Sequence, residues 1–250
     1  SRNNASWAPP VDRLTLTDAA SGGAAATVVG RRVAGPIQGF GQMWQKTFRV
    51  RLPADPNLTP EQVVATWKQE FPTFWPKGNT FYAPLAGIQP GEVALLSVSA
   101  AGPVKLHTGV LVLYADDESF TFITPEGHQF AGLITFSAFR LSGRTVVQVE
   151  VLMRANDPLW ELGMPIAINR IEDRFWNQTL RSIASHFGAS DEVVSEVLGA
   201  VAAAFLLRYL VPETAFTSAS GGTPVVSSAD APFGTPSVVS RVALSCTVRL

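Results

Sequence analysis

Residues 157–188 read DPLWELGMPIAINRIEDRFWNQTLRSIASHFG, and this stretch decides the fold because it predicts one long amphipathic helix. Asp157 can accept hydrogen bonds from the first free amides, Pro158 presets the first helical φ, and Gly188 suits a left-handed C-terminal cap. Apolar residues recur at helical spacing and form one stripe, namely Met164, Ile168, Ile171, Phe175, Ile183 and Phe187. The pattern is typical of a surface helix with one buried face.

A proline interrupts this helical pattern near its start. Pro165 cannot donate a hydrogen bond to the carbonyl of Glu161, which predicts a bend or a break between these two residues. One hypothesis is that Leu159–Met164 acts as a gate while the rest of the helix stays packed.

The residues before this helix predict an antiparallel sheet. Five consecutive segments with strand character are separated by turn residues, namely Val93–Ser99, His107–Tyr114, Ser119–Thr124, Phe130–Phe139 and Thr145–Arg154. In the last of them Val147 and Val149 alternate with Gln148 and Glu150, which predicts one buried and one wet face. The apolar face needs a cover, and the long helix that follows supplies it.

An earlier strand and a short helix complete the predicted domain. Trp44–Leu52 alternates as a half-buried strand, and Lys46 is in phase with its apolar face. Lys46 is therefore either a polar group in a cavity or a solvated strand end. A helix is predicted from Pro60 to about Glu70, with a capping box upstream. Residues 71–85 hold five aromatic residues and three prolines, which predicts an ordered loop.

The composition divides the chain into three parts. Residues 1–32 are rich in small residues and are expected to form a flexible tail. Residues 33–188 form the predicted domain. Residues 189–250 predict a helix at Asp191–Val211, a linker rich in Pro, Gly, Ser and Thr, and a possible edge strand at Val238–Leu250.

The order strand, helical segment, run of strands and long helix resembles the helix-grip fold of the START-like (SRPBCC) superfamily. Its members include polyketide cyclases, pathogenesis-related plant proteins and lipid-transfer domains. Thr124–Gly132, with the sequence TPEGHQFAG, resembles the glycine-histidine turn of an uncharacterised START-like family of bacteria and plants. The similarity continues at Arg154–Pro158, at Leu162-Gly163 and around Arg174 and Arg181, and it covers about residues 33–188.

The resemblance implies an α+β fold in which a curved antiparallel sheet of about six strands wraps around a long C-terminal helix. Such folds commonly leave an apolar cavity between sheet and helix. The many large aromatic residues of the chain fit either a cavity wall or a filled core. The candidate ligand-binding residues are Trp44, Lys46, Phe48, Trp75, Tyr82, Phe122, His128, Phe130, Phe136 and Phe175.

His128 is the candidate catalytic residue. Its Gly-containing turn between two strands can place the ring at the mouth of a cavity, where an ordinary pKa of about 6.5 suits acid-base work. The alternative is that His128 bonds to the backbone and holds the turn.

Several functional classes are not supported by the sequence. A net charge of −1 argues against a nucleic-acid surface, and the single cysteine, Cys246, rules out an internal disulfide and a Cys-based zinc site. The metal-binding, phosphate-binding and nucleophile-elbow motifs do not occur, so we expect no cofactor and no metal. The longest apolar run has eleven residues, short of the roughly 20 that a membrane span needs. A reducing, cytoplasmic location is expected.

Three functions stay open at this point. The first is binding or carrying of an apolar small molecule or lipid in the cavity. The second is a cyclase- or isomerase-like enzyme that uses His128 or Lys46. The third is a scaffold or assembly component in which residues 189–250 dock on a protein partner or a second copy of the chain.

Overall fold

The computed structural model describes residues 4–16, 22–99, 105–163, 169–190 and 193–199. Its strands are β1 (Phe40–Arg51), β2 (Thr80–Tyr82), β3 (Val93–Ser99), β4 (Lys105–Ala115), β5 (Ser119–Ile123), β6 (Phe130–Leu141), β7 (Arg144–Ala155) and β8 (Val194–Gly199). Its helices are α1 (Gly22–Ala26), α2 (Pro60–Gln69), α3 (Pro158–Gly163) and α4 (Asn169–His186), with short 3-10 turns at η1 (Asn4–Ser6), η2 (Pro36–Gln38) and η3 (Phe71–Phe74).

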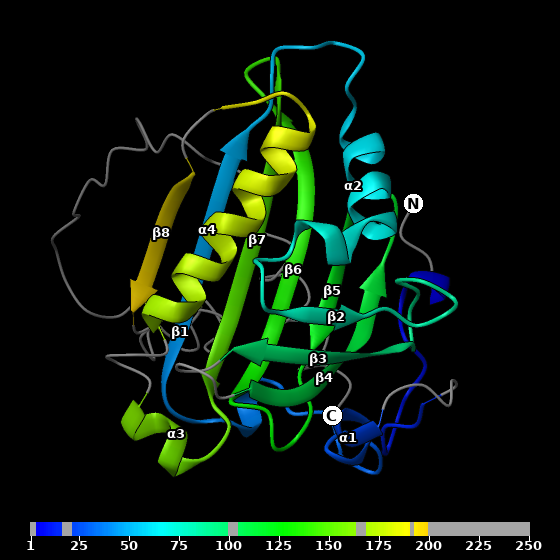
Figure 1. Cartoon of the computed structure of the whole chain (residues 1–250), viewed down its shortest axis with the longest axis vertical. Coiled ribbons are helices and arrows are strands. Elements are labelled where there is room, and N and C mark those ends of the chain that lie inside the picture. Colours follow the sequence, from blue (N-terminus) through cyan, green and yellow to red (C-terminus); the bar gives the residue numbers. More distant parts are fainter. Residues whose placement is uncertain (1–3, 17–21, 100–104, 164–168, 191–192, 200–250) are drawn as a thin grey trace, which may run out of the picture.

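The strands form one curved antiparallel sheet in the order β2-β3-β4-β5-β6-β7-β1-β8, and α4 lies across its concave face (Figure 1). Helix α4 packs on β1, β7 and η3, and α2 packs on β6 and β7 beside it. The prediction of an α+β helix-grip fold is therefore confirmed. The sheet has eight strands instead of about six because β2 and β8 extend it at its two edges.

The predicted helix ends are found at the expected residues. Asp157 Oδ1 accepts hydrogen bonds from the amides of Leu159 (2.8 Å) and Trp160 (3.0 Å), so it caps α3. Gly188 has a φ of +73°, and this left-handed residue ends α4. The capping box predicted for α2 is also present. Pro165 and the predicted bend lie outside the described residues.

A large core fills the space between the concave face and the helices. Its centre is an aromatic cluster in which Phe71 is fully buried and makes edge-to-face contacts with five other rings, namely Trp75, Phe81, Phe120, Phe122 and Phe136. Phe71 and Phe74 belong to the segment that was expected to be an ordered aromatic loop. Within that segment β2 adds a short strand beside β3.

The convex face of the sheet is also covered, which the sequence analysis did not expect. Leu14 and Val28, from the segment predicted to be a tail, are fully buried in a second apolar cluster with Val93, Leu95, Leu111, Ile123 and Leu133. These strand residues point away from α4 and are apolar, so burying them against the N-terminal residues removes them from water. Residues 4–16 and 22–32 thus form a packed layer.

The polar residues of β7 on this face differ from the prediction of a wet surface. Gln148 and Glu150 are 4% and 1% exposed. Gln45 Nε2 donates to Glu150 Oε1 at 2.8 Å, and Arg49 Nε donates to Gln148 Oε1 at 2.6 Å. Cross-strand partners on β1 replace water, because burial requires each polar group to find a hydrogen bond.

Strand β8 lies where the first turns of a helix were predicted. It pairs with β1 so that Val197 lies opposite Lys46. The β-branched residues Val193 and Val194 favour a strand, and the unpaired edge of β1 offers backbone hydrogen bonds. The remaining part of the predicted helix, the linker and the possible edge strand lie outside the described residues.

Candidate functional site

An apolar cavity with a volume of about 170 Å³ lies between the concave face of the sheet and α4. Aromatic side chains from η3, β2, β5, β6 and α4 form much of its wall. Its apolar wall residues include Phe71, Trp75, Phe81, Phe122, Phe130, Phe136, Val151, Met153, Trp160, Phe175 and Trp176. Few polar side chains reach the wall, and two of them are ionisable, His128 and Glu172.

Six of the ten predicted ligand-binding residues lie in this wall, namely Trp75, Phe122, His128, Phe130, Phe136 and Phe175. Their contact with a ligand stays a prediction.

The other four predicted residues lie elsewhere. Tyr82 is 43% exposed because strand alternation turns Phe81 inward in its place. Phe48 is fully buried in the core, and Trp44, which is also on β1, packs against this core. Helix α4 packs directly on β1. The Lys46 side chain extends from the same face of β1 toward α4, where its ammonium group contacts the carboxyl groups of Glu172 and Asp173.

The turn between β5 and β6 holds His128 in the cavity wall. The backbone amide of Phe130 donates to His128 Nδ1 at 3.0 Å, and Gly127 takes the left-handed φ of +83° that the turn needs. Burial lowers the pKa of His128 to about 4. The ring is therefore neutral at pH 7 with its proton on Nε2, so His128 is a hydrogen-bond donor rather than a general base.

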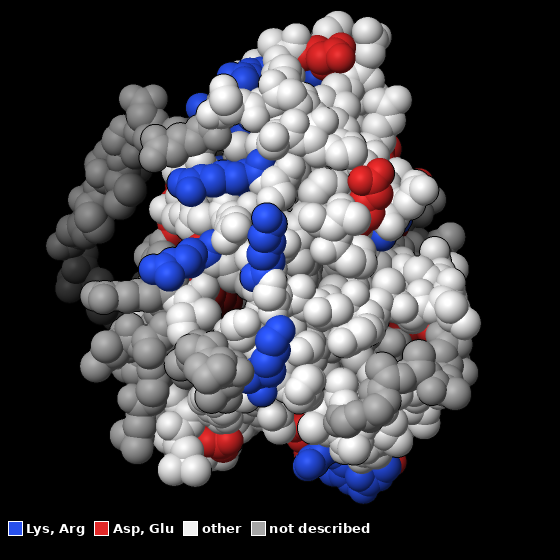
Figure 2. Space-filling view, in the orientation of Figure 1, with Lys and Arg blue, Asp and Glu red and all other residues white. Residues whose placement is uncertain are grey.

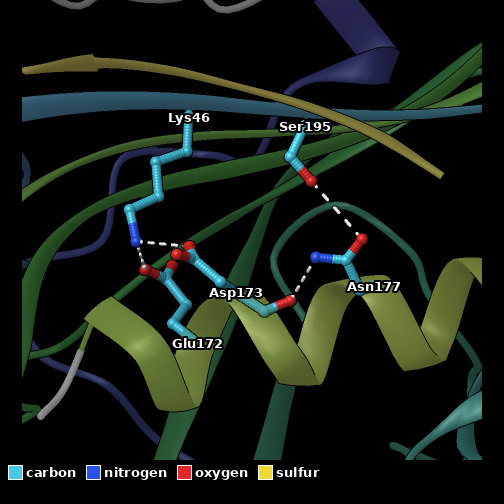
Figure 3. Close-up of polar contacts among 5 residues, drawn as sticks. All are labelled: Lys46, Glu172, Asp173, Asn177 and Ser195. Atoms are coloured by element: carbon cyan, nitrogen blue, oxygen red, sulfur yellow. Dashed lines mark hydrogen bonds and ion pairs between the residues drawn. The ribbon is translucent and has the colours of Figure 1, made fainter.

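The second polar feature is a buried ion cluster that joins β1 to α4 (Figure 3). Lys46 is 1% exposed, and its Nζ donates to Asp173 Oδ1 at 2.7 Å while lying 3.0 Å from Glu172 Oε2. Glu172 lines the cavity, whereas Asp173 lies at the border with solvent. Burial raises the pKa of Glu172 even though the ammonium of Lys46 opposes this shift.

The same side of α4 is tied to the sheet edge. Asn177 Nδ2 donates to the backbone oxygen of Asp173 at 2.7 Å, and Ser195 Oγ of β8 donates to Asn177 Oδ1 at 3.4 Å (Figure 3). These contacts link the helical turn that carries the acidic pair to β8.

Glu172 lines the cavity but was not among the predicted site residues, because it is not one of the apolar residues whose spacing marks the buried stripe of the helix. One signal was available, because Phe175 and Trp176 lie one turn further along the same helix face. A second signal was Lys46, whose phase in β1 predicts a buried cation and therefore a buried acidic partner. Phe71, Phe81, Trp160 and Trp176 also lie in the wall and were not among the predicted site residues.

The molecular face that carries α4 is mixed in charge. Figure 2 shows Lys and Arg side chains spread over this face, beside a hollow in which an acidic side chain is visible. Arg174 and Arg181 are exposed on α4 and belong to the basic helix end noted in the sequence.

In the part of the chain that the structure describes, groups of His, Cys, Asp and Glu suited to holding a metal ion do not occur. Among the described helices there is none with the length and apolar character that crossing a membrane requires.

No protein-family model and no curated protein matches the sequence. Solved structures with a similar fold include a START superfamily protein from Mycobacterium smegmatis, which is 18% identical over 59% of this chain and 98% of that chain, with a TM-score of 0.42. Major latex-like protein 151 from Panax ginseng is 15% identical over 59% of this chain and 99% of that chain, with a TM-score of 0.37.

A third similar structure is the di-domain ARO/CYC StfQ from the steffimycin biosynthetic pathway. It is 7% identical over 58% of this chain and 50% of that chain, with a TM-score of 0.41. Independently of these scores, the order of elements along the chain and the helix laid across one antiparallel sheet are those that the sequence predicted. By its own topology the chain has a helix-grip fold.

Proposed function

We propose that this chain binds an uncharged, apolar small molecule in the cavity between the sheet and α4. The observation that carries the proposal is an apolar space of about 170 Å³ inside a domain that is otherwise closely packed. Protein interiors have few voids larger than a water molecule, because the atoms lining a void lose their packing contacts. An apolar pocket of this size accepts an apolar guest, which restores packing contacts to the lining.

The volume sets the size of the ligand. An apolar cavity of about 150 Å³ binds benzene. The present cavity therefore suits a compound with one or two rings better than a complete lipid with long acyl chains. Edge-to-face aromatic contacts surround the cavity, such as that between Trp75 and Phe175, whose ring centroids are 4.9 Å apart. These contacts favour an aromatic guest.

Tryptophan fluorescence offers a direct test, because Trp75, Trp160 and Trp176 line the cavity. Titration of the full chain with ethylbenzene is expected to change this emission in a saturable way. Val98→Phe, which fills the cavity, is expected to weaken binding at least tenfold. Val29→Phe adds the same volume at an exposed site and serves as the control. Failure of ethylbenzene to bind, or equal binding by V98F and the unchanged chain, would contradict the proposal.

A cyclase- or isomerase-like activity is the second candidate, and the place of His128 in the cavity wall favours it. With Nδ1 engaged by the backbone, His128 would act by donating a hydrogen bond from Nε2 to a substrate carbonyl oxygen, while solvent water takes the proton from the neighbouring carbon. A test is to incubate the chain with small aromatic ketones in D2O and to follow exchange of the protons next to the carbonyl by NMR. Exchange that H128Q lowers supports the activity, and exchange no faster than in buffer contradicts it.

Docking through residues 189–250 and a cytoplasmic location stay predictions. Light scattering on the full chain tests the former, since a mass above that of one 26.7 kDa chain is expected if copies associate.

A further inference from the structure

The ion cluster of Lys46, Glu172 and Asp173 places two carboxyl groups on one ammonium. Lys46 reaches down from β1, and the two acidic residues are neighbours on α4 (Figure 3). In a medium of low dielectric constant one ammonium balances one carboxylate, and a second carboxylate beside the first costs repulsion. The cluster is therefore neutral when one of the two carboxyl groups holds a proton.

The geometry identifies which carboxyl group that is. Lys46 directs its hydrogen bond to Asp173 Oδ1 at 2.7 Å, and Asp173 is 37% exposed, so water supports its charge. Glu172 is 9% exposed, and within the described residues its enclosed Oε2 receives no well-directed hydrogen bond, although Lys46 Nζ lies 3.0 Å away. Burial raises the pKa of Glu172, which favours its protonated form and agrees with this assignment.

Glu172 also has the position of a ligand contact. It lines the cavity, and Phe175 and Trp176 follow it by three and four residues on the same face of α4. A ring held against these two aromatic side chains brings its substituent to the carboxyl group. The carboxyl group of Glu172 is also a hydrogen-bond partner of the Trp176 side chain, so the acid and this ring lie together in the cavity wall.

We propose that Glu172 recognises the ligand by donating a hydrogen bond from its carboxyl group to a carbonyl or hydroxyl oxygen on an otherwise apolar aromatic molecule. The inference rests on the proposed function, because it concerns the same cavity, and it adds the ligand class. The ligand is an uncharged aromatic ketone, aldehyde or phenol rather than a hydrocarbon, an amine or a carboxylic acid. A carboxylate ligand would meet Glu172 without a cation of its own, since Lys46 is already engaged by Asp173.

Three probes of matched size distinguish the ligand classes, namely ethylbenzene, acetophenone and 1-phenylethylamine, which is a cation at pH 7. Titrations of the full chain followed by tryptophan fluorescence give a Kd for each. Acetophenone is expected to bind about tenfold more tightly than ethylbenzene, the ratio that one good hydrogen bond supplies. The cation is expected to bind most weakly.

Variants of Glu172 test the assignment itself. Glu172→Leu is expected to bring the ratio of the acetophenone and ethylbenzene constants to about one. Glu172→Gln, whose amide can still donate, is expected to keep most of the preference. Glu118→Leu removes an acidic residue from an exposed turn and should leave the ratio as it is.

Infrared spectroscopy gives a reading that does not depend on binding. At pH 7 the full chain should show the stretching band of a protonated carboxyl group, and this band should be absent from E172Q.

The outcomes separate the two proposals. Binding of none of the probes overturns the proposed function together with this inference. Binding of ethylbenzene and acetophenone with equal constants, tightest binding of the cation, or absence of the carboxyl band overturns the inference and leaves the apolar site standing.

Discussion

The backbone amide of Phe130 donates a hydrogen bond to Nδ1 of His128 across 3.0 Å, and His128 at the same time lines the cavity. The two roles weighed for this residue are therefore compatible. One ring nitrogen holds the turn between β5 and β6, and the other remains available to a ligand.

The depressed pKa of His128 predicts a loss of stability in acid. In the unfolded chain the ring takes up a proton near pH 6.5, whereas in the folded chain it does so only at about pH 4. The unfolded state thus binds more protons between these values, and the free energy of unfolding falls as pH drops from about 6.5 to about 4. Above about pH 6.5 the lowered pKa of His128 makes no difference to the free energy of unfolding, and at about pH 4 and below it has reduced this free energy by about 3 kcal/mol.

Urea unfolding at a series of pH values checks this prediction. Relative to H128Q, the unchanged chain should lose about 3 kcal/mol of unfolding free energy as the pH falls from about 6.5 to about 4. The difference is the quantity to compare, because Glu172 has a raised pKa and changes stability in the opposite direction as pH falls. A difference that stays constant from pH 6.5 to pH 4 would count against a neutral buried ring.

The Lys46 ion pair predicts an asymmetric response to substitution. Lys46→Met removes the ammonium that Glu172 and Asp173 share, and it should lower the unfolding free energy by about 1–3 kcal/mol, because water screens the partly exposed carboxylate of Asp173 that is left behind. The double variant K46M/D173L also removes the carboxylate to which Lys46 donates and should recover much of this loss. Thermal unfolding of the three chains at pH 7 measures the effect, and a double variant less stable than K46M would contradict it.

Gly132 of β6 predicts a local steric limit. A Cβ at this position would lie 2.5 Å from the carbonyl oxygen of Leu152 and 2.9 Å from Met153 Cβ on the neighbouring strand β7. Gly132→Ala should therefore destabilise the fold by about 1–3 kcal/mol, the usual range for overpacking. Gly35→Ala is the matched control, because its nearest neighbour is the movable end of Gln38 at 3.3 Å. If G132A and G35A had equal midpoints of urea unfolding, strands β6 and β7 would accommodate the added methyl group, which would contradict the prediction.

The layer on the convex face predicts that the N-terminal residues contribute to stability. Leu14 is fully buried against the sheet, so Leu14→Ala should cost about 3 kcal/mol from lost burial and the cavity left behind. Val29→Ala, at a half-exposed position of the same segment, should change stability by less than about 0.5 kcal/mol. If L14A unfolds at the same urea concentration as V29A, the segment behaves as the tail that its composition indicates.

The fold was predictable because its signals are local and repeated. Period-two alternation in the strands, the capping box at Thr59 and the caps at Asp157 and Gly188 each fix an element without knowledge of its neighbours. The packed N-terminal layer was not predictable from composition, because residues 1–32 are dominated by small and polar residues and Leu14 and Val28 belong to no long periodic pattern. Their burial depends on which strand residues face them.

The site was predictable only in part, for a related reason. The aromatic wall follows from the number and spacing of the rings, so residues such as Phe122 and Phe136 could be chosen from the strand pattern. The choice between Phe81 and Tyr82 depends on the phase of a three-residue strand, which is too short to show a period. The pairing of Lys46 with Glu172 joins residues far apart in sequence, and only the crossing of α4 over β1 brings them together.

Strand β8 has a consequence for how copies of this chain meet. Without it β1, which has twelve residues, would present an open row of backbone donors and acceptors to other molecules. With it the sheet is bordered by β2 and β8, which have three and six residues. Short edge strands are a common protection against the addition of strands from other molecules. By pairing with β1, β8 therefore prevents aggregation through the backbone groups of this long strand.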